Sequence, residues 1–282
     1  MSSTAYAKQI DGLTWDEYRA YPLPSQSDLK AAWDDAQLWH ETNVLKCIEK
    51  PGPSASQQWG TQCEAMLRDG PNDAIEIIPP EVLTSNGARR GKAWEAYRDA
   101  NADKQLVTEK EYLDKHYGLE RAVQNVSEHR YATSLLADVE WSVRIEWDNG
   151  SGFQMKGELD CLNADKAYVV DVKTATDNSP EVFQRDAIKW GYDIQAAAYL
   201  EAASILLDAD LRWFWVVVQN KAPWKVEVYQ AIYEVLEYGR DRLVERQEWF
   251  DRCRETDTWR SPTLGEIVEL NLPNYLRERV QT

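Results

Sequence analysis

Two aspartates and one lysine, spaced for a β-hairpin, constrain the fold of this 282-residue chain more than any other feature. In residues 157–175 (GELDCLNADKAYVVDVKTA), Asp160 is followed after ten intervening residues by Asp171 and then, two positions on, by Lys173. The segments on either side of the polar residues 163–166 have the composition of strands, and those four residues are typical of a turn. A hairpin of this size brings Asp160 opposite Asp171 and Lys173.

The alternation of side chains along the second strand separates its charged residues from its apolar ones. Asp171 and Lys173 share one face, whereas Val170 and Val172 point to the other. Buried carboxylates are costly unless they share a cation, and carboxylate oxygens are preferred ligands of Mg²⁺. We therefore expect a divalent-metal site at this edge of the sheet, of the kind that cleaves phosphodiesters. The alternative is a solvated Asp–Lys ion pair, which is common across hairpins and contributes little to stability.

A helix and two further strands are predicted after the hairpin. Residues 187–207 are rich in Ala and Leu with a helical pattern, and Gln195 and Tyr199 lie four apart on one of its faces. Residues 211–230 indicate two strands around a Pro-containing turn, the first a nearly continuous apolar run suited to the centre of a sheet. The predicted order of elements is therefore three strands, a helix and two strands.

This order resembles the core of the PD-(D/E)XK nuclease superfamily, and more narrowly its RecE-type branch, the exonuclease VIII-like enzymes of phages and prophages. The matching pieces are Gly157-Glu158-Leu159-Asp160, Asp171-Val172-Lys173-Thr174, Gln195 with Tyr199, and residues 214–219 followed by Ala222-Pro223-Trp224. Segments at 23–29, 60–64, 89–94 and 265–273 are also similar, so the resemblance covers most of positions 20–275.

The resemblance implies an α/β fold in which a mixed central β-sheet is flanked by helices, the restriction-endonuclease-like core. Residues 1–56 are expected to form an N-terminal helical segment that packs on the core. Residues 57–282 are expected to form the nuclease domain, with both parts in one compact unit.

The hairpin and the following helix carry the predicted chemistry. Asp160 and Asp171, with the backbone carbonyl of Val172, are the expected ligands of one or two Mg²⁺ ions, with Mn²⁺ as a substitute. Lys173 is placed beside the attacking water, where it orients the water or helps to remove its proton. Gln195 is expected to hydrogen-bond this water or a DNA phosphate.

The segment at 60–64 departs from the pattern of many relatives, which carry Gly-Thr-x-x-His where this chain ends in Glu64. A Glu from the corresponding helix helps to hold the metal in lambda-type exonucleases of the same superfamily, so the resemblance suggests Glu64 as a third acidic ligand. The alternative is a Glu on a helix surface. Glu158, Tyr199 and Thr174 are expected to support the site from behind the ligands, with a solvated Glu158 as the alternative.

Net charge argues against a DNA enzyme, because a formal charge of −16 repels phosphate on average. Bound metal ions and a locally basic channel would offset this repulsion. The candidates for the channel are Arg89, Arg90, Lys92, Lys156, Arg185 and Lys189, each of which has ordinary solvation as its alternative. The turn from Arg89 to Lys92 is the predicted holder of a 5′ phosphate.

The cysteines and the hydropathy exclude several other classes. Cys47, Cys63, Cys161 and Cys253 are scattered without a C-x-x-C pair, which predicts neither a zinc ribbon, a disulfide scaffold nor an iron–sulfur cluster. No apolar run reaches transmembrane length, and the polar start does not resemble a secretory signal. A cytoplasmic protein with no membrane partner is expected.

The resemblance implies a metal-dependent 5′-to-3′ exonuclease that acts on linear duplex DNA and leaves 3′ overhangs for recombination. It also implies a ring-like homo-oligomer and a partner single-strand annealing protein. Two alternatives stay open: an endonuclease or a repair or defence nuclease on the same fold, and a non-catalytic DNA- or protein-binding module.

Overall fold

The predicted hairpin is present in a computed structural model that describes residues 4–70, 75–102, 104–260, 267 and 269. By its contacts the chain separates into two units, of which the first, Met1–Gln26 with Pro51–Leu243, contains the hairpin. The second unit comprises Ser27–Lys50 and Val244–Thr282. Each unit is made of two separate stretches of sequence. The predicted division into residues 1–56 and 57–282 remains a prediction.

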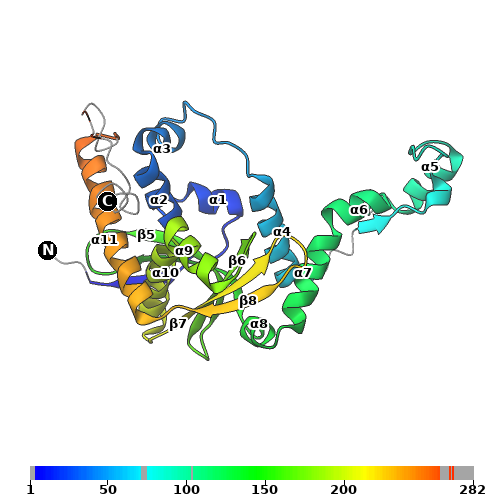
Figure 1. Ribbon diagram of the computed structural model, residues 1–282. Coiled ribbons are helices and arrows are strands. Elements are labelled where there is room, and N and C mark those ends of the chain that lie inside the picture. Colours follow the sequence, from blue (N-terminus) through cyan, green and yellow to red (C-terminus); the bar gives the residue numbers. More distant parts are fainter. Residues whose placement is uncertain (1–3, 71–74, 103, 261–266, 268, 270–282) are drawn as a thin grey trace, which may run out of the picture. The chain divides into compact units, whose positions relative to one another are not determined.

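The first unit is built on a six-stranded mixed sheet in the order β1-β4-β5-β6-β7-β8 (Figure 1). Its strands are β1 (Tyr6–Gln9), β4 (Glu140–Asp148), β5 (Met155–Asn163), β6 (Tyr168–Ala175), β7 (Arg212–Gln219) and β8 (Val226–Gln230). Only β6 and β7 pair in parallel, over the full length of both strands, and the other neighbouring strands are antiparallel. The parallel pair requires a crossover, which the helices between β6 and β7 supply.

The apolar pattern of β7 confirms the prediction of an interior strand. Val216, Val217 and Val218 are each fully buried, because helices cover both faces of the sheet. Phe214 faces the same apolar cluster as Val216 and Val218, whereas Trp213 lies on the opposite face, 6.4 Å from the ring of Tyr199.

The crossover consists of two helices, α9 (Pro180–Trp190) and α10 (Tyr192–Leu207), rather than the single helix predicted over residues 187–207. The break lies at Gly191, which adopts a left-handed conformation with φ of 74° that ends α9 and begins α10. The sequence does not reveal this break, because the helical pattern of apolar residues continues on both sides of Gly191. The break makes Tyr192 the first residue of α10.

Helix α11 (Tyr233–Thr256) crosses α10 at a distance that only glycine permits. A Cβ atom built on Gly239 would lie 2.2 Å from the backbone oxygen of Asp193 on α10. Close by, the fully buried carboxylate of Asp193 forms an ion pair with Arg242, at 2.7 Å between Oδ2 and the guanidinium. Helix α10 is therefore fixed against α11 by a backbone contact and by a buried charge pair.

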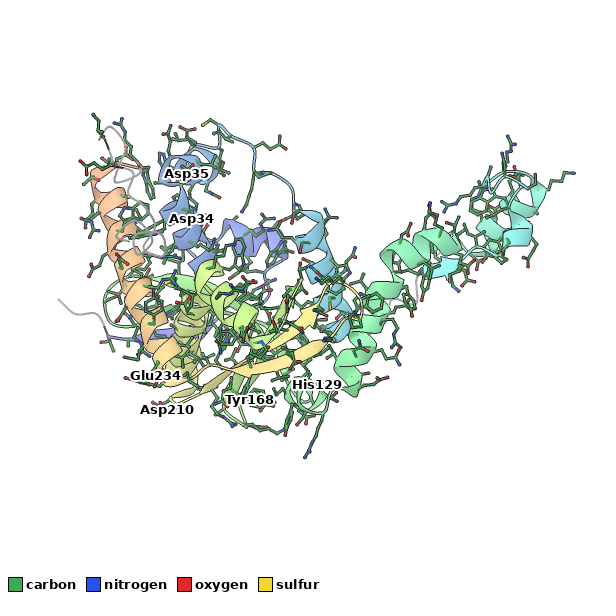
Figure 2. The ribbon with its side chains drawn as sticks, viewed as in Figure 1. Asp34, Asp35, His129, Tyr168, Asp210 and Glu234 are labelled. Carbon is green, nitrogen blue, oxygen red and sulfur yellow. The ribbon has the colours of Figure 1, made fainter. Side chains whose placement is uncertain are left out.

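The opposite face of the sheet is covered by α4 (Ala55–Asp69), α7 (Tyr117–Glu128) and α8 (Arg130–Leu136). Fully buried residues from these helices and from β5, β6 and β7 form one apolar cluster, which includes Cys63, Ala122, Cys161, Val170 and Val216. At its rim the Tyr168 hydroxyl donates a hydrogen bond of 3.0 Å to the Leu135 carbonyl of α8 (Figure 2). This cluster is the core beneath the hairpin.

Shorter elements complete the first unit. They are α1 (Trp15–Ala20), β2 (Ile75–Ile77), a 3₁₀ turn (Pro80–Val82), α5 (Lys92–Ala100), β3 (Gln105–Val107) and α6 (Glu109–Lys115). Strands β2 and β3 form a separate parallel pair. Helix α6 contacts α7, so this segment is continuous with the helical cover of the sheet.

The second unit contains α2 (Gln26–Asp34), α3 (Ala36–Asn43) and the end of α11. Its centre is aromatic, with Trp39 5.0 Å from Phe250 and 5.0 Å from Trp259. The segment at 265–273 that resembles a closing strand lies outside the described residues, apart from Ile267 and Glu269.

Candidate active site

The site begins where the two strands of the hairpin part. The pairing of β5 with β6 runs from Asn163 opposite Tyr168 to Cys161 opposite Val170, whereas β6 remains paired with β7 as far as Ala175. Asp160 is the next residue of β5, and its Oδ2 accepts a hydrogen bond of 2.8 Å from the backbone N–H of Val172. The carboxylate of Asp160 therefore satisfies an N–H group that would otherwise lack a partner at the end of the ladder.

Asp171 and Lys173 lie on the face of β6 that α10 covers, as the alternation predicts. The Lys173 ammonium is 2.6 Å from Asp171 Oδ2, and the Gln195 side-chain amide donates a hydrogen bond of 2.8 Å to Asp171 Oδ1. Asp171 is only 1% exposed. Both oxygens of a buried carboxylate are thus held by residues predicted from the sequence to act with it.

Tyr192 joins this group although the sequence analysis did not select it. Its ring centre lies 5.0 Å from the Lys173 ammonium, in a cation–π contact. Tyr192 precedes Gln195 by three positions, so both residues lie on one face of α10. That spacing is the signal that identifies Tyr192, in the same way that Gln195 and Tyr199 were paired.

Helix α4 brings Glu64 towards the site. A Cβ atom built on Gly60 would lie 3.1 Å from Thr174 Oγ1, so this face of α4 runs close to the end of β6. Glu64 lies one turn further along the same face, followed after another turn by Arg68. Burial and the charge of Asp160 raise the pKa of Glu64 to about 7, against the opposing charges of Arg68 and Lys173. Arg68 is a second residue that the sequence analysis missed, and its four-residue spacing from Glu64 is the signal for it.

The same crowding acts on the aspartates. Burial raises the pKa of Asp171 to about 7, although Lys173 acts in the opposite direction. Burial also raises the pKa of Asp160, against the effects of Lys173 and of the hydrogen bond from Val172. Burial alone would lower the pKa of Lys173, but Asp171 and Asp160 together outweigh it, so that its pKa is raised. The ammonium is therefore kept charged by the carboxylates around it.

The donor atoms fit a hard divalent cation in their chemistry. Asp160, Asp171 and Glu64 supply carboxylate oxygens whose mutual repulsion a cation would relieve, and the Val172 carbonyl belongs to the residue directly after Asp171. In the part of the chain that the structure describes, however, no three His, Cys, Asp or Glu side chains are gathered closely enough to hold a metal ion. The residues are present in the site, and the roles of individual ligands remain predictions.

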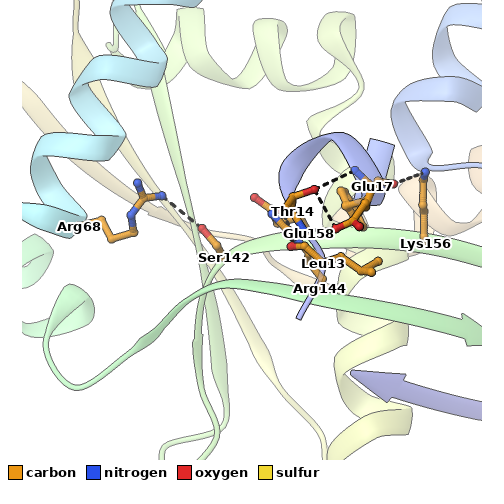
Figure 3. A network of polar contacts seen from close by, with 9 residues as sticks. Leu13, Thr14, Glu17, Arg68, Ser142, Arg144, Lys156 and Glu158 are labelled. Atoms are coloured by element: carbon orange, nitrogen blue, oxygen red, sulfur yellow. Dashed lines mark hydrogen bonds and ion pairs between the residues drawn. The ribbon is translucent and has the colours of Figure 1, made fainter. Parts of the chain in front are cut away.

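Glu158 is held by a partner that the sequence did not reveal (Figure 3). Arg144 of β4 donates to Glu158 Oε2 at 2.6 Å and to the carbonyl of Leu13 at 2.7 Å, and its guanidinium lies 4.8 Å from the ring centre of Tyr18. Glu158 therefore links β5 to the segment before α1.

Tyr199 contacts the sheet rather than the charged residues. Its ring packs against Gly157 and lies 6.4 Å from that of Trp147 in a T-shaped arrangement. Burial raises the pKa of Tyr199 well above its ordinary value, so its hydroxyl stays protonated. The predicted supporting role of this residue is consistent with helix-to-sheet contacts.

Lys156 contradicts its assignment to an exposed basic channel. It is 5% exposed, and its ammonium donates hydrogen bonds of 2.8 Å to the carbonyls of Tyr18 and Tyr21 and of 3.2 Å to that of Arg19. The residue donates to carbonyls at the end of α1, where that of Tyr18 also accepts the backbone N–H of Tyr21. A sequence offers no signal for this use, because α1 lies far from β5 along the chain.

The other basic candidates lie on exposed positions. Arg89 forms an ion pair with Glu111 and a cation–π contact of 5.9 Å with Trp94, while Arg90 and Lys92 are exposed. Lys189 and Arg185 are exposed on α9, and the Lys189 ammonium lies 4.5 Å from the ring centre of Trp190. None of the described contacts joins these residues to Asp171 or Lys173. Their proposed contacts with DNA remain predictions.

The described helices show no membrane span: none combines sufficient length with sufficient apolar character to cross a bilayer.

Comparisons with known proteins bear on the fold that carries this site. A family model described as "PDDEXK-like domain of unknown function (DUF3799)" matches residues 86–270, which include β4 to α11. Among solved structures, the chain is similar to a protein of Eubacterium rectale described as a candidate exonuclease, with a TM-score of 0.62 and 12% identity, covering 95% of this chain and 98% of that one. The mixed sheet flanked by helices is thus the fold of a PDDEXK-like nuclease, as predicted.

A second solved structure, a phage-related exonuclease from Haemophilus somnus 129PT, is matched with a TM-score of 0.35 and 15% identity, covering 86% of this chain and 100% of that one. A likeness this low carries no argument about the fold. No curated protein matches the sequence.

Proposed function

Because the chain belongs to the family of PDDEXK-like domains DUF3799, we propose that it is a metal-dependent deoxyribonuclease that degrades linear duplex DNA. More narrowly, the proposed activity is a 5′-to-3′ exonuclease that removes one strand and leaves a 3′ overhang. This direction follows from the resemblance to RecE-type enzymes.

One observation carries the proposal: Asp171 is buried and is held by Lys173 at 2.6 Å and by Gln195 at 2.8 Å, at the point where two strands part. A solvated ion pair would not require burial of the carboxylate or a hydrogen bond from a second element. The alternative of an ordinary surface pair is therefore disfavoured.

PDDEXK nucleases generally use divalent metals, and Mg²⁺ or Mn²⁺ is the ion proposed for this chain. Asp160, Asp171, the carbonyl of Val172 and Glu64 are the residues that would hold it. When bound, the ion would lower the pKa of an attacking water and offset charge on the scissile phosphate.

The residues of the chain have separate tasks in this proposal. Lys173 carries a positive charge beside the reacting phosphate, where it orients the water and stabilises negative charge that develops in the transition state. Gln195 fixes the orientation of Asp171 through its hydrogen bond, and its amide is in reach of the water or of a phosphate oxygen. Glu158, Tyr199 and Thr174 hold the elements that carry these groups.

Binding of DNA requires local positive charge on an acidic protein. Carboxylates such as those of Asp34, Asp210 and Glu234 are exposed (Figure 2), in keeping with the net charge of −16. We assign Arg89, Arg90, Lys92 and Lys189 to the phosphate backbone of the substrate. A ring-like homo-oligomer, an annealing protein that loads onto the 3′ overhang and a cytoplasmic location complete the proposal.

The test is digestion of 5′-phosphorylated linear duplex DNA in Mg²⁺, alongside circular duplex DNA and an EDTA control. Loss of the linear substrate alone, with nucleotides released first from the 5′ end, is expected. Release from the 3′ end would reverse the proposed direction and leave the nuclease activity standing.

Two results would replace the proposal. Cleavage of the circular duplex would indicate an endonuclease on this fold. No cleavage in either Mg²⁺ or Mn²⁺ would instead favour a non-catalytic module, for which binding to the same DNA would be measured next.

A further inference from the structure

The ring of Tyr192 contacts the ammonium of Lys173 from a separate element. Among the described residues, no other aromatic ring makes a cation–π contact with this ammonium. Lys173 Nζ lies 2.6 Å from Asp171 Oδ2 and 5.0 Å from the centre of the Tyr192 ring. The lysine belongs to β6, whereas the tyrosine is the first residue of α10. The ammonium is thus restrained by a carboxylate on its own strand and by an aromatic face across the crossover.

The ring itself is supported from behind. Phe183 of α9 lies 6.1 Å from the Tyr192 ring and is 3% exposed. Phe183 stacks on Tyr229 of β8 at 4.7 Å with an interplanar angle of 17°. The Tyr229 hydroxyl donates a hydrogen bond of 2.5 Å to the Asn178 carbonyl. A column of three aromatic rings therefore runs from the edge strand β8 to the ammonium.

The hydroxyl of Tyr192 takes no part in this arrangement. Among the described residues it makes no hydrogen bond, although burial raises its pKa. The contact with Lys173 is made by the ring face, whose negative electrostatic potential attracts a cation. A phenylalanine at this position would present the same face.

We infer that Tyr192 is a positioning residue that restricts the side chain of Lys173 to the conformation required for phosphodiester cleavage. A lysine side chain has four rotatable bonds and loses considerable entropy when its ammonium is confined to one place. Asp171 alone confines it weakly in direction, because an ammonium is a compact charge with three equivalent donors. The ring face supplies the second restraint. This inference rests on the proposed nuclease function.

The kinetic test uses Tyr192→Phe, Tyr192→Leu and a matched control, Tyr131→Leu. Tyr131 is 61% exposed on α8 and makes a cation–π contact of 5.5 Å with Arg130, so its variant removes a similar contact elsewhere. Digestion of linear duplex DNA is measured over a range of substrate concentrations. Tyr192→Leu is expected to lower kcat by roughly 10- to 30-fold with little change in KM. Tyr192→Phe and Tyr131→Leu are expected to match the unaltered protein.

A second measurement is independent of catalysis and of bound metal. Metal-free protein labelled with ¹³C at the lysine ε-carbons is studied by NMR, and the Lys173 signal is assigned by its loss in Lys173→Ala. The ring face is expected to shift the ε-proton signal of Lys173 upfield in the unaltered protein and in Tyr192→Phe. The upfield shift should disappear in Tyr192→Leu.

Several results would overturn the inference. A loss of kcat in Tyr192→Phe as large as in Tyr192→Leu would assign the role to the hydroxyl. Unchanged kcat in Tyr192→Leu, or no upfield shift in the unaltered protein, would remove the positioning role. If no protein cleaves DNA, the proposed function fails, and the NMR comparison alone decides whether the ring restrains Lys173. Should Tyr192→Leu fold poorly, Tyr192→Met takes its place, because its unbranched flexible side chain adapts to an irregular space and lacks the ring.

Discussion

The two ends of the hairpin formed by β5 and β6 differ in how the strands are joined and in what their side chains contact. At the closed end, Cys161 to Asn163 pair with Tyr168 to Val170 along the strands, and the side chains of Cys161, Tyr168 and Val170 pack in the apolar core. At the open end, Asp160 and Asp171 follow directly, and the Asp160 carboxylate takes over a backbone N–H. One extra step along each strand thus changes core into charged site. The comparison teaches that the site forms where the pairing of β5 with β6 ends. Strand β6 is held in place beyond that point by its pairing with β7.

The largest expected difference between the two ends is in activity. Lys173→Ala at the open end should lower DNA cleavage by at least about 10³-fold, because it removes the charge beside the reacting phosphate. Its free energy of unfolding should also fall, because the buried carboxylate of Asp171 loses its charge partner. Endpoint digestion and urea denaturation of the same preparation measure both. Undiminished cleavage would remove Lys173 from the mechanism.

Two variants of Asp160 separate its proposed role as a metal ligand from its role as a hydrogen-bond acceptor. Asp160→Asn and Asp160→Ala should both lower cleavage by roughly 10²- to 10³-fold, since each removes a charged ligand. Only Asp160→Ala should also lose about 1–3 kcal/mol of stability, because an Asn oxygen still accepts the hydrogen bond from Val172. Equal stability of the two variants would show that this N–H finds another partner.

At the closed end the effects should be reversed. Val170→Ala should lower the free energy of unfolding by about 2 kcal/mol, because the side chain is fully buried in the core cluster. Cleavage by the folded fraction should remain near that of the unaltered protein. A large fall in kcat below the melting transition would mean that the two ends are coupled.

Glu64 provides a finer test of the open end. If it is a third ligand, Glu64→Gln should raise the Mg²⁺ concentration needed for half-maximal cleavage by roughly tenfold or more. Arg68→Gln serves as the control, because it changes charge on the same helix face without removing a carboxylate. An unchanged Mg²⁺ titration in Glu64→Gln would return this residue to a helix-surface role.

The smallest expected effect is on stability as a function of pH. The pKa values of Glu64 and Asp171 are raised to about 7 in the folded protein, mainly by burial. Between their ordinary values near 4 and this value, the folded state binds more protons than the unfolded state, so stability falls as pH rises. Metal-free protein in EDTA should therefore become less stable to urea as the pH is raised from 5.5 to 8. The combined variant Glu64→Gln with Asp171→Asn should show a flatter profile, and a steep one would contradict these assignments.

Much of the frame was predictable because its signals are local. The spacing of Asp160 and Asp171 and the apolar run of β7 follow from short segments whose periodicity is clear. Gln195 was selected from its helical spacing, but its hydrogen bond to Asp171 was not predicted. The single helix predicted at 187–207 was wrong, because Gly191 interrupts it without interrupting its apolar pattern.

The remainder of the site depends on contacts between distant segments. Lys156 was assigned to a channel, whereas it satisfies carbonyls of α1, more than 130 residues away along the chain. Arg144 forms an ion pair with Glu158 from the neighbouring strand, and the periodicity of neither strand predicts that pair. Tyr192 was within reach of sequence reasoning, since it lies three residues before Gln195. It was missed because the start of α10 at Tyr192 was not predicted.

The crossing of α10 and α11 has a consequence for how mutations in this protein would be read. Glycine within a helix costs about 1 kcal/mol relative to alanine, so exchange at such a position is often tolerated or favourable. At Gly239 even a methyl group would meet the backbone of Asp193, two residues before Gln195. A survey that replaced each residue in turn and scored DNA cleavage would therefore rank Gly239 with the catalytic set. Only a parallel survey of protein abundance would separate a residue that performs chemistry from one that makes room for it.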